Sequence, residues 1–159
     1  MSDERLLWHY TTGVTFQSIL HDCLMKPATA GVPQGGRPAV WFSRNEIWEP
    51  TANKVFLSPD GTPRLSTTEE MLRHGQGLIR IGVKRETAPH NWDEFVRLSG
   101  ASERTVRALK AAAKACGSNH KDWFVSFDPV PREKWVVVED RRGSAWVALA
   151  LPSTFSTDI

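Results

Sequence analysis

The stretch LLWHYTTGVTFQSIL, residues 6–20, decides how this chain begins to fold. Its apolar start predicts a buried strand over 6–10, and the apolar residues that follow recur at helical spacing, which predicts an amphipathic helix over 14–22. Two residues with polar groups, His9 and Tyr10, end the predicted strand. Polar groups at the end of a buried strand are either satisfied locally or directed into a site. We therefore take His9 and Tyr10 as the first candidate site residues.

The length and charge of the chain set further bounds. Its 159 residues are enough to bury the core of one domain, so we predict a single domain over 1–159. The formal net charge is +2 and basic residues are interspersed with acidic ones, which gives a nucleic-acid partner little support. The N-terminus lacks the pattern of a secretory signal, and no stretch is long and apolar enough to span a membrane. We expect a soluble, cytoplasmic protein with no membrane partner.

Two cysteines, Cys23 and Cys116, fall inside predicted helices among apolar neighbours. Neither has His or Cys residues nearby at the spacing that a metal site requires. We therefore expect no metal, and a reducing compartment fits this cysteine usage best.

The remaining segments alternate between strands and helices, with late strands predicted over 78–83, 123–128, 134–139 and 145–151. The 78–83 segment alternates as a strand with one solvated face would, and Asp140 to Gly143 reads as a hairpin turn. Between the first helix and an apolar strand over 39–43 lies a Gly/Pro-rich loop over 26–38, which we predict to be a mobile lid. This order predicts an α+β fold with a largely antiparallel or mixed sheet.

Two further helices carry recognisable end signals. Ser66 and Glu69 have the spacing of a capping box, with Gly75 where that helix would stop. Ser102 is the expected N-cap of the clearest helix, and Gly117 is its expected end.

Seven tryptophans are many for a chain of this length, and their positions differ in meaning. Five lie in or beside predicted strands, where large rings ordinarily fill a sheet core. Trp48 lies instead in the polar stretch RNEIWEPTANK, where Pro50 forbids a regular ladder or helix interior. We therefore predict Trp48 as a stacking platform for a planar ligand.

Two stretches together resemble a known family. LWHYTTGVTFQSILHDCLMKPAT (7–29) and AVWFSRNEIWEPTANK (39–54), joined by the Gly/Pro loop, resemble the start of the catalytic domain of the ADP-ribosyltransferase superfamily, in its diphtheria-toxin-like and poly(ADP-ribose) polymerase-like branch. His9 matches the first-strand histidine of that branch, and Trp41 stands where its second-strand aromatic is usually tyrosine. The pair Thr51-Ala52 matches its Ser/Thr-Ala pair.

The third signature of the family is a glutamate at the start of a late strand. The run KDWFVSFDPVP (121–131) has that shape but places Asp122 at the glutamate position. Aspartate is one methylene shorter, which withdraws the carboxylate by about 1.5 Å, and a misplacement of that order can cost roughly a hundredfold in rate. Glu49 is the alternative carboxylate, and Glu133 would need a shifted alignment.

The resemblance implies a split, mainly antiparallel sheet with flanking helices and a site for NAD as substrate. Breaking the nicotinamide–ribose bond builds positive charge on the ribose, which a carboxylate stabilises. In this scheme His9 binds the adenosine ribose and the Tyr10 backbone binds the nicotinamide amide. The other expected NAD-binding residues are Thr11, Trp41, Ser43, Trp48 and Thr51, and the catalytic residues are Asp122 or Glu49, with His9.

The resemblance implies a mono-ADP-ribosyltransferase that modifies a protein or a nucleic acid. Such an enzyme would be a bacterial toxin, effector or defence protein; a toxin of this kind can be delivered into a target cell without a cleavable signal, and an antitoxin or immunity protein would be its partner. Two alternatives stay open. One is an NAD glycohydrolase, and the other is a non-catalytic member that binds a nucleotide or a partner.

Overall fold

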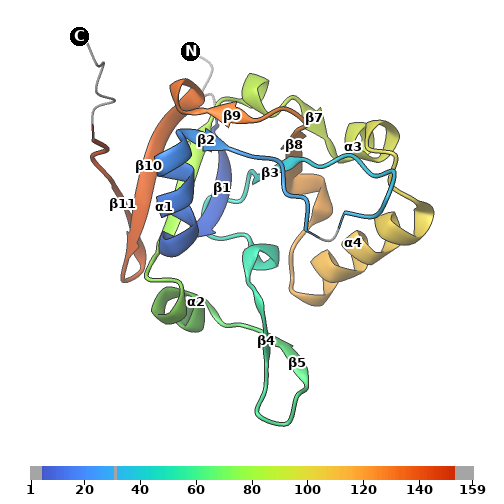
Figure 1. Ribbon diagram of the computed structural model, residues 1–159, viewed down its shortest axis with the longest axis horizontal. Helices are drawn as coiled ribbons and strands as arrows, with labels where there is room; N and C mark the ends of the chain where they lie inside the picture. Colours follow the sequence, from blue (N-terminus) through green and yellow to red (C-terminus); the bar gives the residue numbers. More distant parts are fainter. Residues whose placement is uncertain (1–4, 31, 153–159) are drawn as a thin grey trace.

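The computed structural model describes residues 5–30 and 32–152, which form an α+β fold around a seven-stranded antiparallel sheet (Figure 1). The strands lie in the order β11 (Ala145–Ala148), β10 (Trp135–Arg142), β6 (Leu78–Val83), β1 (Leu7–Thr12), β3 (Val40–Ser43), β8 (Trp123–Ser126) and β7 (His90–Asn91). The predicted fold class and antiparallel sheet are thereby confirmed. Residues 1–4, at the start of the N-terminus examined for a secretory signal, and Gly31 of the Gly/Pro loop lie outside the described residues.

Helices, two small sheets and short 3-10 turns complete the described part of the chain. The helices are α1 (Gly13–Asp22), α2 (Thr68–His74), α3 (Trp92–Leu98) and α4 (Glu103–Ala115). The small sheets pair β2 (Leu24–Met25) with β9 (Val130–Pro131) and β4 (Val55–Leu57) with β5 (Pro63–Leu65). The 3-10 turns are η1 (Pro50–Ala52), η2 (Arg85–Thr87), η3 (His120–Asp122) and η4 (Arg132–Lys134).

The central sheet is divided between β1 and β3. β1 pairs with β6 over six residues, whereas its register with β3 consists of one pair, Trp8 opposite Ser43. On its other side β3 pairs with β8 over four residues. The two halves of the sheet are therefore joined at one point, and β1 and β3 separate beyond it.

The two faces of the sheet are covered by different helices (Figure 1). Because side chains alternate along a strand, Leu7 and its register partner Val83 share one face, where they join a core with Phe16 of α1. On the opposite face Trp8 belongs to a cluster with α2, and Trp123 belongs to a cluster with α3 and α4. The division of the sheet thus separates two clusters on the same face.

Local signals placed several elements correctly. In α1, Thr12 is the N-cap and its hydroxyl accepts from the Thr15 amide at 3.3 Å. Ser102 caps α4 in the same way. Cys23 and Cys116 were predicted inside helices but are the C-caps of α1 and α4.

Other boundaries differ from the sequence predictions. The capping box of α2 is formed by Thr67 and Glu70, one residue later than the predicted pair Ser66 and Glu69, while Gly75 ends the helix as expected. The hairpin between β10 and β11 turns at Gly143 and Ser144, since Arg142 pairs with Ala145. β6 was predicted with one solvated face, yet all six of its residues are buried because it lies in the middle of a covered sheet. Helix α3 and the β4–β5 hairpin were not predicted.

Candidate functional site

A cavity of about 360 Å³ lies where β1 and β3 separate. Its lining includes three consecutive residues from each strand, and side chains of α4 and η1 close it. Since side chains alternate between faces, three consecutive residues line one cavity only when the edge of the strand itself borders it. The lining consists of Trp8, His9, Tyr10, Trp41, Phe42, Ser43, Glu49, Thr51, Ala52, Leu109, Ala112 and Trp123.

The side chain of His9 crosses the gap between the two strands. Its Nδ1 lies 2.8 Å from the carbonyl oxygen of Trp41, so this nitrogen carries a proton and donates. Burial lowers the pKa of His9 below its ordinary value of 6.5, although the hydrogen bond to Trp41 acts in the opposite direction. The ring is therefore neutral at pH 7, and its Nε2 carries a lone pair that can accept a hydrogen bond.

The peptide group of Tyr10 is directed toward the same gap. The backbone amide of Arg44 donates to the backbone carbonyl of Asp122, on the β8 side of β3. The backbone carbonyl of Trp41 instead points to the β1 side, where it accepts from His9. The backbone N–H and C=O groups of successive residues point alternately to the two sides of a strand. Those of Ser43, two residues after Trp41, therefore also point toward β1, and those of its register partner Trp8 point toward β3. Two residues further along β1, the N–H and C=O of Tyr10 point the same way. A cavity bordered by these groups can bind a planar amide.

Glu49 is a buried carboxylate at the cavity, only 6% exposed. It accepts hydrogen bonds from the hydroxyls of Ser43 at 2.8 Å, of Thr51 at 2.6 Å, and of Ser118. Glu49 also caps η1, because its carboxylate accepts from the Thr51 amide. Ser43 accepts from the backbone amide of Asn45, so its own proton is committed to Glu49. These donors fix the orientation of the carboxylate.

Aromatic rings form one wall of the cavity. Trp41 stands edge-on to Trp123 at 5.8 Å and to Phe95 of α3 at 4.6 Å. The indole N–H groups of Trp8 and Trp123 are buried and have no hydrogen-bond partner among the described residues.

Six predicted site residues line this cavity together: His9, Tyr10, Trp41, Ser43, Glu49 and Thr51. Asp122 was predicted as the leading catalytic carboxylate, but the structure places it outside the lining. It ends η3, and its carboxylate accepts from the Arg44 guanidinium at 2.7 Å. The ion pair holds this side chain at the partly exposed end of β3 and β8, away from the cavity.

Trp48 and Thr11 are also outside the cavity lining. Trp48 was predicted as a stacking platform, but it is 8% exposed and stacks on Trp146 with centroids 6.3 Å apart. Its indole N–H donates to Asn53, and its ring packs against Tyr10 at 4.9 Å. The Trp48 side chain is therefore packed in the core, because the turn after β3 folds back onto the sheet. Thr11 lies on β1 beyond the lining residues.

The sequence did not identify all the residues of the site. Leu109 of α4 and Trp123 were not predicted as site residues, yet both line the cavity. Ser118 follows α4, and 69 residues separate it from Glu49, so no local pattern relates the two. The sequence feature that came nearest to indicating Ser118 was Gly117, which marked the end of the helix. A polar residue that follows a helix end can reach another element.

The Gly/Pro loop lies beside the site. Its Ala28 amide donates to the Ala39 carbonyl, and its Arg37 amide donates to the Ser99 carbonyl after α3. A second cavity of about 160 Å³ lies between this loop and α3 and α4, and it shares Trp41 and Leu109 with the first. A lid movement of the loop would have to break these hydrogen bonds, and that role stays a prediction.

We expect acid to destabilise the protein through His9. The unfolded chain binds a proton near the ordinary pKa of 6.5 and the folded chain only at lower pH, so the free energy of unfolding falls as pH drops below about 6.5. His9→Gln should therefore lose less stability than the parent between about pH 7.5 and about pH 5.5, as urea titrations would measure. Equal losses in parent and variant would contradict a neutral, buried His9.

The described residues contain no helix long and apolar enough to cross a membrane and no group of three or more His, Cys, Asp or Glu side chains that could hold a metal ion. Comparisons with protein-family models, curated proteins and solved structures find no match to this chain.

Proposed function

We propose that this protein is a mono-ADP-ribosyltransferase that uses NAD as substrate and transfers ADP-ribose to a macromolecular acceptor. The observation that carries the proposal is the cavity at the division of the sheet, where His9, Trp41 and the buried carboxylate of Glu49 meet. This arrangement agrees with the split sheet that the sequence resemblance implies. The activity, with NAD as its substrate, is inferred from these residues and from that resemblance.

The cavity suits the nicotinamide–ribose half of NAD. Its volume of about 360 Å³ lies toward the lower end of the range for small-molecule sites. Trp41 and Trp123 offer apolar faces for the pyridine ring, and the peptide group of Tyr10 matches the donor and acceptor of a carboxamide. The neutral His9 ring offers Nε2 as an acceptor for a ribose hydroxyl.

Glu49 is the carboxylate that we assign to the chemistry. The bond between ribose C1′ and the nicotinamide nitrogen breaks, and both bonding electrons leave with nicotinamide. A carboxylate near the ribose 2′-hydroxyl stabilises the positive charge that develops on the sugar. The acceptor then bonds to C1′ and loses a proton. Hydroxyls of Ser43, Thr51 and Ser118 hold Glu49 in place, so little reorganisation accompanies the reaction.

The test is incubation with NAD labelled in its adenylate phosphate, in the presence and absence of a cell extract. We expect nicotinamide release and label on macromolecules. His9→Ala should reduce release about tenfold or more, the equivalent of one lost hydrogen bond to a polar ligand. Free ADP-ribose without labelled macromolecules would favour the glycohydrolase, and no turnover together with unchanged binding in His9→Ala would contradict the proposed site.

A further inference from the structure

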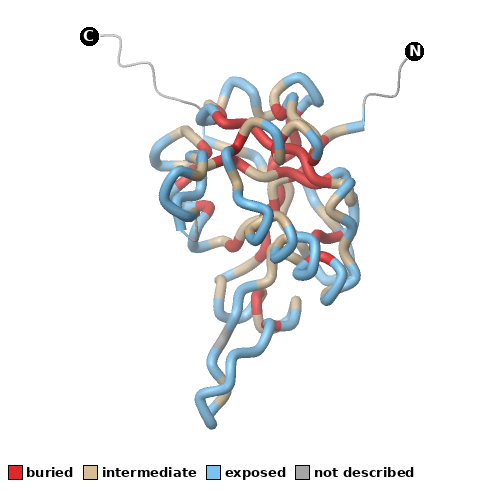
Figure 2. Tube along the Cα trace, turned by 90° about the vertical axis from the view of Figure 1, so that its right-hand side faces the viewer, coloured by how far each residue is buried: buried red, intermediate tan, exposed pale blue. Residues whose placement is uncertain are grey.

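The β4–β5 hairpin projects from the body of the protein (Figure 1). Figure 2 shows that this projection is exposed along most of its length. Its two strands pair with each other alone in a separate two-stranded sheet, so each has an outer edge that is unpaired among the described residues. Unpaired strand edges carry free backbone donors and acceptors that can pair with another extended chain.

One face of the hairpin is entirely apolar. Val55 is opposite Leu65 and Leu57 is opposite Pro63, and residues directly opposite each other in an antiparallel pair share a face. Val55 is 63% exposed, Leu57 is 74% exposed and Leu65 is 43% exposed. Large apolar side chains grouped in this way mark an interaction surface more often than scattered ones do.

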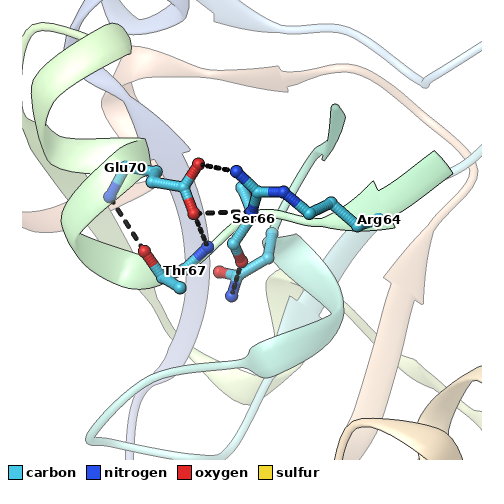
Figure 3. A network of polar contacts seen from close by, with 5 residues as sticks. Arg64, Ser66, Thr67 and Glu70 are labelled. Atoms are coloured by element: carbon cyan, nitrogen blue, oxygen red, sulfur yellow. Dashed lines mark hydrogen bonds and ion pairs between the residues drawn. The ribbon is translucent and has the colours of Figure 1, made fainter. Parts of the chain in front are cut away.

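The opposite face of the hairpin is anchored to the body. The Arg64 guanidinium binds both carboxylate oxygens of Glu70 at 2.7 Å, and Glu70 belongs to the capping box of α2 with Thr67 (Figure 3). At the base of the hairpin, the Ser66 amide donates to the Lys54 carbonyl at 2.8 Å. The apolar face is therefore presented on a fixed support, which lowers the entropy cost of binding.

The hairpin begins next to the candidate site. Ala52 lines the cavity, and Val55 follows it by three residues. Three peptide units span at most about 11 Å between Cα atoms, so a chain bound along β4 would start close to the cavity mouth.

We infer that the apolar face of β4 and β5 docks the acceptor, and that this acceptor is a protein that binds through an extended segment bearing apolar side chains. The inference rests on the proposed function. An extended polypeptide uses both features of the hairpin, since its backbone pairs with a free edge and its side chains pack on the apolar face. Nucleic acid does not fit, because the face carries no charge and Arg64 is neutralised by Glu70.

The size of the surface favours an acceptor over a second copy of this chain. Four apolar side chains are far fewer than the roughly 20 to 30 residues that each partner contributes to a stable interface. A small surface beside a cavity suits a partner that must bind, react and leave.

The experiment combines two readouts on the full chain: nicotinamide release without extract, where water bonds to C1′ in place of the acceptor and loses a proton, and label transferred from adenylate-labelled NAD to macromolecules in a cell extract. The test variant is V55S/L57S, and the control is Val136→Ser, which removes an exposed apolar side chain from β10. We expect V55S/L57S to reduce the transferred label about tenfold or more while its nicotinamide release stays unchanged. The label should be removed by protease and resist nuclease, and Val136→Ser should behave as the parent does.

The contrary outcomes are separable. Undiminished labelling by V55S/L57S, or label that nuclease removes, would overturn the docking inference and leave the proposed function standing. Nicotinamide release by the parent chain without labelled macromolecules would overturn the proposed transferase in favour of the glycohydrolase, and the docking inference with it. Absence of nicotinamide release from the parent chain would overturn the proposed function, and the docking inference with it.

Discussion

Glu49→Gln is expected to lower the rate of nicotinamide release from NAD by about a hundredfold or more, which is the usual effect of removing a group that stabilises charge in a transition state. Glutamine has nearly the same size, and its amide oxygen can still accept from Thr51, which donates to Oε1 of Glu49 in the parent. Its NH2 group then takes the place of Oε2, so the Ser43 hydroxyl, which donates there in the parent, must turn to accept. The change therefore removes the negative charge with little change in side-chain volume. NAD binding should change much less than turnover, because the charge on the ribose develops only in the transition state.

Asp122→Asn is the matched control for that variant. Its carboxylate pairs with Arg44 outside the cavity, so we expect its rate to stay within about threefold of the parent. Single-turnover assays on both variants, with thermal melts to establish folding, make the comparison. Loss of activity in Asp122→Asn alone would return the catalytic role to the start of β8. Full activity in both variants would contradict a carboxylate mechanism.

Arg80→Ala is expected to destabilise the protein by about 3 to 5 kcal/mol, the usual cost of removing one partner of a buried ion pair. Arg80 is 8% exposed and binds the Glu139 carboxylate of β10 at 2.8 Å. Its guanidinium also lies 3.8 Å from the ring centroid of Trp8, 4.7 Å from that of Trp146, and donates to the Glu46 carbonyl. The substitution leaves the Glu139 carboxylate without its arginine partner and removes the packing of the guanidinium between these rings.

Urea unfolding of the variant measures this effect. Arg142→Ala provides the control, because Arg142 forms an exposed ion pair with Asp140 on the same strand, and we expect its cost to be below about 1 kcal/mol. Equal costs for the two variants would show that Arg80 acts only as a surface charge. Tyr10 packs near Arg80, and burial raises the pKa of its phenol to about 12, so titration of that phenol does not affect the comparison near neutral pH.

Local sequence signals predicted many of the elements. The apolar start of β1, the N-cap Ser102 and the stop at Gly75 depend on interactions within a few residues, and the structure confirms them. The β4–β5 hairpin and α3 escaped prediction. The hairpin exposes the apolar residues that a core pattern would hide, and α3 is short and begins at Trp92, directly after a two-residue strand.

The sequence also predicted part of the candidate site. His9, Trp41 and Glu49 lie in segments that the early motifs cover, and the structure brings them to one cavity. Asp122 and Trp48 were chosen by the same reasoning but lie outside its lining. The side chain of Asp122 is held by an arginine, and that of Trp48 packs against two aromatic rings. Such contacts depend on which segments meet in space.

The sequence by itself determined the chemistry that is available and the elements that carry it, since periodicity, caps and residue types act within one turn or one strand. The tertiary structure alone decided where β1 and β3 part, because strand register is set by the packing of both faces of the sheet. It also decided that Ser118 reaches Glu49 across 69 residues, and that Glu49 is the carboxylate at the cavity. Contacts between distant segments form only when the chain buries its apolar faces together, and no local pattern records them.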